Sequence, residues 1–170
     1  MNWGLLVNES LLLGLVLSTI LTIMVIVSFL INKEMWLNDY PPDVKAKWGP
    51  ISSKANRQHR VFAILFFLVL ISAMVYDVFR LESVLGIQPS FMAIFTSIVI
   101  VLALFNLVDA VIIDWFILQV LWPGLAILPG TEGMPGYKDA RRWIINLVKG
   151  FALAPIAGIL VAGVVTLFFR

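Results

Sequence analysis

The chain has 170 residues, of which 61% are hydrophobic and only 13% are charged, and its mean hydropathy is +1.01. Soluble globular domains are about 45–50% apolar and about 25% charged, so this composition excludes an ordinary soluble domain. The charged residues lie between apolar runs of about 20 residues, the length that crosses a hydrocarbon core as an α-helix. We therefore expect an integral membrane protein.

The rare residue types exclude several kinds of site. The chain has no cysteine, which excludes disulfide frameworks, thiolate metal sites and cysteine nucleophiles. His59 is the single histidine, so no multi-histidine metal site can form within one chain. The net charge is only +2, and the basic residues flank the apolar runs, which is typical of membrane boundaries rather than of nucleic-acid-binding patches. We expect no metal, no cofactor and no nucleic-acid partner.

Four apolar runs predict an all-α, polytopic fold in which residues 1–170 form a single transmembrane domain. The predicted spans cover about 11–31, 61–79, 91–118 and 143–169, and the long loops cover about 32–60 and 120–142. The third run stays apolar as far as Trp122, so we expect a long helix that extends into the cytoplasmic interface. An alternative splits this run near 106–109, but that segment contains neither the Gly nor the Pro that a turn between two spans would favour.

The basic residues favour one orientation. Ten of the twelve Lys and Arg residues lie in 32–60 or 138–149, and only Arg80 and Arg170 lie on the opposite side. The positive-inside rule then places both long loops in the cytoplasm and both termini outside. On the outer side, Asp77 precedes Arg80 by three residues on one helical face, which predicts a local ion pair.

The fourth run carries a small or modestly polar residue at every fourth position, a pattern that lets another helix approach closely in lipid. The row consists of Asn146, Gly150, Ala154, Gly158, Ala162 and Thr166. We expect it to pack against another helix of the same chain; a homo-oligomer interface and a hinge in a moving helix are the alternatives. The first run shows no equally clear row. Pro155, near the middle of the fourth run, predicts a kink because proline cannot donate a helical hydrogen bond.

Three strongly polar residues, Asn106, Asp109 and Asp114, interrupt the third run. In an α-helix they fall within an arc of about 140°, and Asp109 lies about 27 Å along the axis from Phe91, near the inner boundary of the membrane. A charge costs less there than at the centre of the bilayer. Two interpretations stay open: the aspartates pair with Lys or Arg from the loops, or they line a cavity that binds a cation or a lipid headgroup.

Both loops have specified local structure. Pro41 and Pro42 in the first loop predict extended backbone. In the second loop, residues 129–136 contain three glycines and two prolines, which predicts a particular turn path. Its N–H groups, with Arg141 and Arg142 nearby, would suit an anion such as a phosphate. A tight surface connection is the alternative.

Three segments together resemble a group of small prokaryotic membrane proteins of uncharacterised function. They are DYPPDV at Asp39–Val44, DW at Asp114–Trp115, and PGTEGMPGYKD at Pro129–Asp139. The resemblance runs from the first loop into the fourth span. It implies four spans in a prokaryotic cytoplasmic membrane, and it implies no activity, cofactor or catalytic residue.

Three classes of function remain. The first is binding or transport of an amphiphilic or charged small molecule at a cytoplasm-facing site, with membrane lipids as partners. The residues expected to bind the ligand are Asn106, Asp109, Asp114, Glu132, Arg141 and Arg142. The second is a structural or accessory subunit that assembles with copies of itself or with other membrane subunits. The third is a membrane enzyme acting on a lipid phosphate, although no recognised spacing supports it. Its acid–base candidates are Asp39, Asp43, His59, Asp109, Asp114, Glu132 and Asp139.

Overall fold

The structure is a computed structural model that describes residues 1–169, apart from the side chains of Ala140 and Arg142. Over that range the chain forms helices and turns and no strand. Four helices are long and apolar enough to cross a membrane: Trp3–Ile31, Ser53–Leu85, Phe91–Leu121 and Trp143–Phe168. The predicted all-α, polytopic fold with four spans is therefore confirmed.

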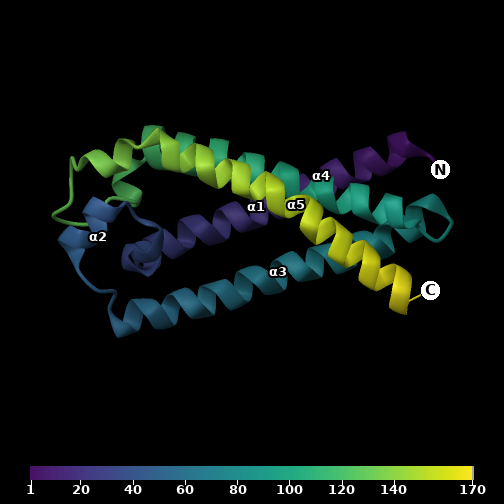
Figure 1. The fold of residues 1–170 in the computed structure, drawn as a ribbon, viewed down its shortest axis with the longest axis horizontal. Helices are drawn as coiled ribbons and strands as arrows, with labels where there is room; N and C mark the ends of the chain where they lie inside the picture. Colours follow the sequence, from purple (N-terminus) through teal and green to yellow (C-terminus); the bar gives the residue numbers. More distant parts are fainter. Residues whose placement is uncertain (170) are drawn as a thin grey trace.

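These spans correspond to four long elements of the chain. They are α1 (Trp3–Ile31), α3 (Ser53–Leu85), α4 (Phe91–Val108) continuing into η2 (Asp109–Leu121), and α5 (Ala140–Phe168). Both termini lie at one end of the bundle, with the α3–α4 connection, and the two long loops lie at the other end with the short helix α2 (Pro42–Trp48) (Figure 1). The structure thus separates the termini from the loops, as the charge pattern predicts.

Two of the helices begin well before their apolar runs, because polar caps outside the runs start them. The Asn2 side chain accepts the N–H of Leu5, so α1 begins at Trp3 rather than near residue 11. The Ser52 side chain accepts the N–H of Ala55, so α3 begins at Ser53 rather than near residue 61. The helices therefore extend past the apolar segments that predict them.

Helix α4 is the centre of the bundle, and it packs most extensively against α5 and α1. Leu17 and Leu21 of α1 form a core with Val101 of α4, and Ile94 and Ile98 of α4 are fully buried in a second cluster with Ala162 of α5. Helix α3 packs mainly against α1, and only 6% of its most apolar window is buried. Its apolar side chains face outward, where lipid would cover them.

The row of small residues on α5 faces α4 of the same chain. A Cβ atom at Gly150 would overlap the Asn106 side chain, and one at Gly158 would lie 3.0 Å from Phe95 Cδ2. Ala154 and Ala162, between and beyond these glycines, are buried. The close approach of two helix backbones depends on these small residues. Pro155 lies inside the helix, and the axis of α5 bends partway along its length in Figure 1.

Helix α1 also carries a row of small residues, shorter than that of α5, which was not expected from the sequence. Ser10, Gly14 and Ser18 are all buried, and a Cβ at Gly14 would lie 3.0 Å from Leu104 Cδ2 of α4. The two serines donate to backbone carbonyls one turn earlier, Ser10 to Leu6 and Ser18 to Gly14. Small residues of α1 and of α5 therefore contact α4 from two sides.

The predicted ion pair between Asp77 and Arg80 is wrong. Arg80 Nε instead donates to Glu9 Oε2 of α1 at 3.0 Å. Asp77 is buried and its Oδ1 lies 2.9 Å from Ser97 Oγ of α4. Sequence spacing puts Asp77 and Arg80 on one face of α3, but a neighbouring helix offers each of them a partner.

The third run continues through residues 106–109 without a turn, so the alternative that splits it is wrong. The hydrogen bonding changes within the run, however. From Asp109 the chain forms a π-helix, η2, and the N–H of Trp122 bonds to the carbonyl of Ile117, five residues earlier, at 2.8 Å. π-Helices are rare and occur frequently at functional sites.

Candidate functional site

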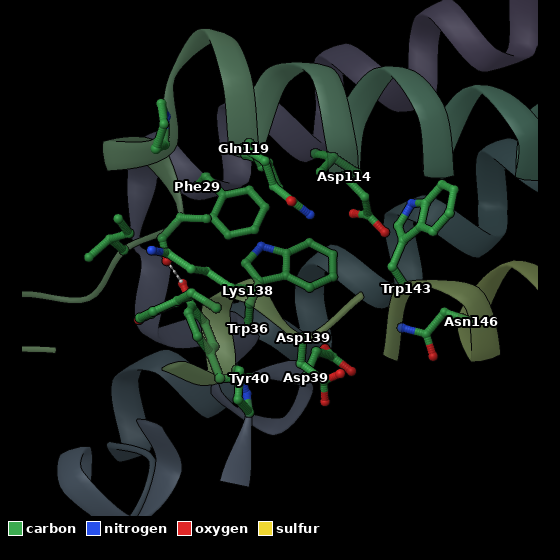
Figure 2. A pocket seen from close by; sticks show the side chains of 18 of the residues that line it. Phe29, Trp36, Asp39, Tyr40, Asp114, Gln119, Lys138, Asp139, Trp143 and Asn146 are labelled. Atoms are coloured by element: carbon green, nitrogen blue, oxygen red, sulfur yellow. Dashed lines mark hydrogen bonds between the residues drawn. The ribbon is translucent and has the colours of Figure 1, made fainter. Parts of the chain in front are cut away.

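A cavity of about 570 Å³ lies at the loop end of the bundle. Its walls come from the end of α1, from η2, from the start of α5 and from both long loops (Figure 2). This volume is within the range of about 300–1,000 Å³ that small-molecule sites occupy. The aromatic side chains in its lining are Phe29, Trp36, Tyr40, Tyr137 and Trp143, and the charged ones are Asp39, Asp109, Asp114, Lys138 and Asp139.

The π-helical geometry of η2 places Asp109 and Asp114 in the same cavity. In an α-helix, residues five apart point in directions about 140° apart. In a π-helix the hydrogen bond joins residue i to residue i+5, so residues five apart lie nearly above each other. The two carboxylates therefore line the same space. Among the described side chains, neither Asp109 nor Asp114 has a hydrogen bond or an ion pair.

One wall of the cavity is an aromatic cluster around Trp36, which lies in the short 3₁₀-helix η1 (Lys33–Asp39). Its ring stacks on Phe29 with centroids 5.4 Å apart and meets Phe62 edge-on at 5.0 Å. Its Nε1 donates to Ser28 Oγ at 2.9 Å. These contacts fix the ring with its remaining surface toward the cavity.

Two polar side chains, those of Asn32 and Glu34, hold the first loop in place. The Asn32 side chain accepts the N–H of Glu34 at 3.0 Å, which starts η1. The Glu34 carboxylate accepts the N–H of Ser52 at 2.7 Å and its hydroxyl at 2.8 Å. Burial opposes ionisation of Glu34, but these hydrogen bonds outweigh it and hold its pKa below the ordinary value. The carboxylate thus joins both ends of the loop.

The prolines of the first loop have different conformations. Pro41 is extended, as predicted, with φ −56° and ψ 152°. Pro42 does not continue the extended segment but begins α2, where a missing N–H costs no hydrogen bond. The prediction of extended backbone is therefore correct only for Pro41.

The second loop is docked on the first. Gly136 N donates to Asp43 Oδ2 at 2.9 Å, and a Cβ at Gly136 would overlap the Asp43 side chain. The backbone of the second loop thus binds an anion, as its turns suggest, but that anion is a carboxylate of the same chain. The interpretation as a tight surface connection describes this geometry better than a free phosphate cradle.

Two tyrosines and a lysine hold the loops at the cavity. The Tyr40 hydroxyl donates to the Ala126 carbonyl at 2.5 Å, and its ring meets Tyr137 edge-on at 6.0 Å. Burial, and then the proximity of Tyr137, raise the pKa of Tyr40 above its ordinary value, which keeps it a neutral donor. Lys33 Nζ donates to the carbonyls of Gly124 and Ile127 at 2.5 and 3.2 Å.

Trp143 connects α5 to η2 at the opposite wall. Its Nε1 donates to the main-chain carbonyl of Ala110 at 2.7 Å. Trp143 and Asp114 project into the cavity from the two facing helices (Figure 2). The Trp143 indole and the half-buried Asp114 carboxylate therefore line the same cavity.

Of the five expected ligand-binding residues whose side chains the structure describes, Asp109 and Asp114 line the cavity. Asn106 Nδ2 donates to the Leu147 carbonyl at 3.0 Å and serves the contact between α4 and α5. Glu132 is exposed and accepts the N–H of Gly130 at 3.0 Å, and backbone hydrogen bonds, its own N–H first, lower its pKa. The Arg141 side chain is exposed outside the lining. The Arg142 side chain lies outside the described residues.

Much of the lining was not expected from the sequence. Asp39 and Asp139 were expected only as acid–base candidates of an enzyme, and Trp36, Tyr40 and Trp143 were not expected at the site. Asp39 and Tyr40 belong to the DYPPDV segment and Asp139 ends PGTEGMPGYKD, so these two loop segments meet at the cavity. Aromatic residues close to aspartates in both loops are the signal that would have indicated them.

Nowhere in residues 1–169, as far as their side chains are described, do three or more His, Asp or Glu side chains form a group that could hold a metal ion. The described lining instead combines four aspartates, one lysine and several aromatic faces. Asp39, Lys138 and Asp139 are exposed, whereas Asp109 and Asp114 are half-buried. This arrangement suits an organic cation: aromatic faces attract cations, and carboxylates provide the opposite charge.

Comparison of the chain with protein-family models, with curated proteins and with solved structures finds no match.

Proposed function

We propose that the protein binds an organic cation, or the cationic headgroup of an amphiphile, in the cavity formed by η2 and the two loops. The observation that carries the proposal is the pair Asp109 and Asp114, which share a cavity with aromatic rings and have no hydrogen-bonding or ionic partner among the described residues. Two such carboxylates repel each other, and a cation between them would relieve that repulsion.

The aromatic residues make an ammonium group a better ligand than a small inorganic ion. Trp36, Tyr40 and Trp143 each have a hydrogen bond that fixes the ring at the cavity wall. A cation over a desolvated aromatic face gains about 2 kcal/mol, with Trp the most favourable ring. An alkylated ammonium also sheds its water more easily than a compact metal ion.

The charge of the lining disfavours a phosphate ligand. The two half-buried charged groups of the described lining, Asp109 and Asp114, are both acidic, so an enzyme acting on a lipid phosphate is the less favoured interpretation. The orientation is part of the same proposal. Because ten of twelve basic residues lie at the loop end, we place the cavity on the cytoplasmic side of a prokaryotic inner membrane and both termini outside.

Binding of tetraethylammonium to the full chain in lipid nanodiscs tests the proposal. We expect saturable binding, detected as a change in tryptophan fluorescence, that weakens as salt concentration rises. A neutral alcohol of similar size, 3-ethyl-3-pentanol, and benzoate serve as the neutral and anionic comparisons. Equal binding of the anion, or no saturable binding of the cation up to millimolar concentration, would exclude the cationic ligand and favour a structural or accessory subunit.

A further inference from the structure

A second polar site lies at the opposite end of the bundle, where α1, α3 and α4 meet. It consists of Asp77 from α3, Ser97 from α4 and Ser10 from α1, all buried, with Asp77 only 2% exposed. Asp77 Oδ2 is buried and has no hydrogen-bond partner among the described residues. A buried carboxylate oxygen without a partner is costly unless the group is neutral or holds a cation.

No charged side chain of the described residues compensates Asp77. The nearest basic residue in the sequence, Arg80, pairs with Glu9 of α1 at 3.0 Å. Tyr76 and Glu82 of α3 are exposed, away from the buried site. Helix α4 contributes no charged residue between its ends, and neither does the part of α5 beyond Lys149 as far as Phe169. The charge of an ionised Asp77 would therefore be buried alone.

The hydrogen atoms available at this site provide an independent argument. Ser97 Oγ lies 2.9 Å from Asp77 Oδ1 and 2.7 Å from Ser10 Oγ. Ser10 Oγ lies 2.7 Å from the main-chain carbonyl oxygen of Leu6. Each of these three contacts between oxygens needs one hydrogen, but the two hydroxyl groups supply only two. An ionised Asp77 supplies none, so one contact would join two oxygens with no hydrogen between them.

We infer that Asp77 is a proton-binding site within the membrane and that it holds its proton in the assembled bundle. The neutral acid supplies the missing hydrogen: Asp77 donates to Ser97, Ser97 donates to Ser10, and Ser10 donates to the Leu6 carbonyl. The unpartnered Oδ2 is then the carbonyl oxygen of a neutral acid and no longer carries part of a buried charge. The proton thus connects α3 to α4 and α1 at the end of the bundle where Arg80 of α3 also pairs with Glu9 of α1. This inference does not depend on the cation cavity.

Infrared spectroscopy of the full chain in nanodiscs in D₂O near neutral pD tests this inference. We expect the wild type to show a carbonyl band of a protonated carboxylic acid that Asp77→Asn lacks. Glu9→Gln is the matched control, because Glu9 is ion-paired with Arg80: it should remove carboxylate intensity and leave the acid band unchanged. If Asp77→Asn removes carboxylate intensity instead, Asp77 is ionised and the inference is wrong.

Ser97→Ala decides the question if Asp77→Asn does not assemble. This variant removes the acceptor of the Asp77 proton but keeps the carboxyl group. We expect the acid band to shift in frequency, because a carboxylic acid without its acceptor has a different carbonyl stretch. An acid band at the wild-type frequency in folded Ser97→Ala protein would show that the band does not come from an Asp77 bonded to Ser97, and would overturn the inference.

Discussion

The main-chain N–H of Gly136 donates to Asp43 Oδ2 at 2.9 Å, and this contact joins the two long loops through residues that are 93 positions apart in the sequence. Both residues belong to segments with a specified local sequence, Asp39–Val44 and Pro129–Asp139. The contact needs a residue without a Cβ at position 136. The two loops therefore form one unit, and both contribute to the lining of the cavity.

Gly136→Ala should separate the loops. The added Cβ overlaps the Asp43 side chain, so we expect a loss of about 1–3 kcal/mol of stability, the usual cost of overpacking, and weaker binding of the cationic probe. Thermal unfolding in detergent and probe titration measure the two effects. Gly124→Ala is the control, because a Cβ there meets no atom within 4 Å. Equal behaviour of the two variants would show that the loop contact does not support the cavity.

Gly150→Ala and Gly163→Ala test the packing of α5 against α4. At Gly150 the new Cβ would overlap the Asn106 side chain, so we expect a lower unfolding temperature and loss of the Asn106–Leu147 hydrogen bond. At Gly163 the Cβ meets nothing within 4 Å, and replacing a helical glycine by alanine should stabilise the protein by up to about 1 kcal/mol. If Gly150→Ala lowers the unfolding temperature no more than Gly163→Ala does, this packing is contradicted.

Trp143→Phe should loosen the junction between α5 and η2. A smaller aromatic ring replaces the indole and no longer donates to the Ala110 carbonyl, which lies within the π-helix η2 and keeps its helical N–H partner; the loss of one hydrogen bond costs about 0.5–1.5 kcal/mol. We expect reduced thermal stability and a probe affinity lowered several-fold. Trp115→Phe is the comparison, since Trp115 is 51% exposed. If Trp115→Phe lowers stability as much as Trp143→Phe does, the hydrogen bond to Ala110 contributes nothing specific.

Glu34 gives the first loop a dependence on pH. Its folded pKa lies below the ordinary value of 4.5, because the hydrogen bonds from Ser52 outweigh the effect of burial. A group with a lowered folded pKa stabilises the fold fully above its unfolded pKa, and that stabilisation is lost as pH falls through the folded pKa. We expect wild-type stability to fall more steeply below about pH 4.5 than that of Glu34→Gln. Parallel curves of unfolding temperature against pH would contradict this role.

The sequence predicts the spans well because each apolar run is a local property. Caps such as Asn2 and Ser52 explain why two helices start earlier than their runs. The pairing of Asp77 was predicted wrongly, since spacing within one helix does not reveal that Glu9 and Ser97 approach from other helices.

The cavity could be predicted only in part. Asp109 and Asp114 are recognisable because carboxylates are rare in an apolar run. Their common orientation depends on the change to π-helical bonding at Asp109, which hydrophobic periodicity does not indicate. The loop residues of the lining depend on long-range contacts, such as that of Tyr40 with Ala126, that no local pattern contains.

The most direct test of cation binding compares tetraethylammonium affinity in the wild type, in the double variant Asp109→Asn with Asp114→Asn, and in Glu132→Gln. The double variant keeps the shape of the cavity and removes both inner charges, so we expect the affinity to fall at least about tenfold, the equivalent of about 1.4 kcal/mol. Glu132 is an exposed carboxylate outside the lining, and Glu132→Gln should bind like the wild type. Unchanged affinity in a folded double variant, or an equal loss in Glu132→Gln, would contradict a cation site at Asp109 and Asp114.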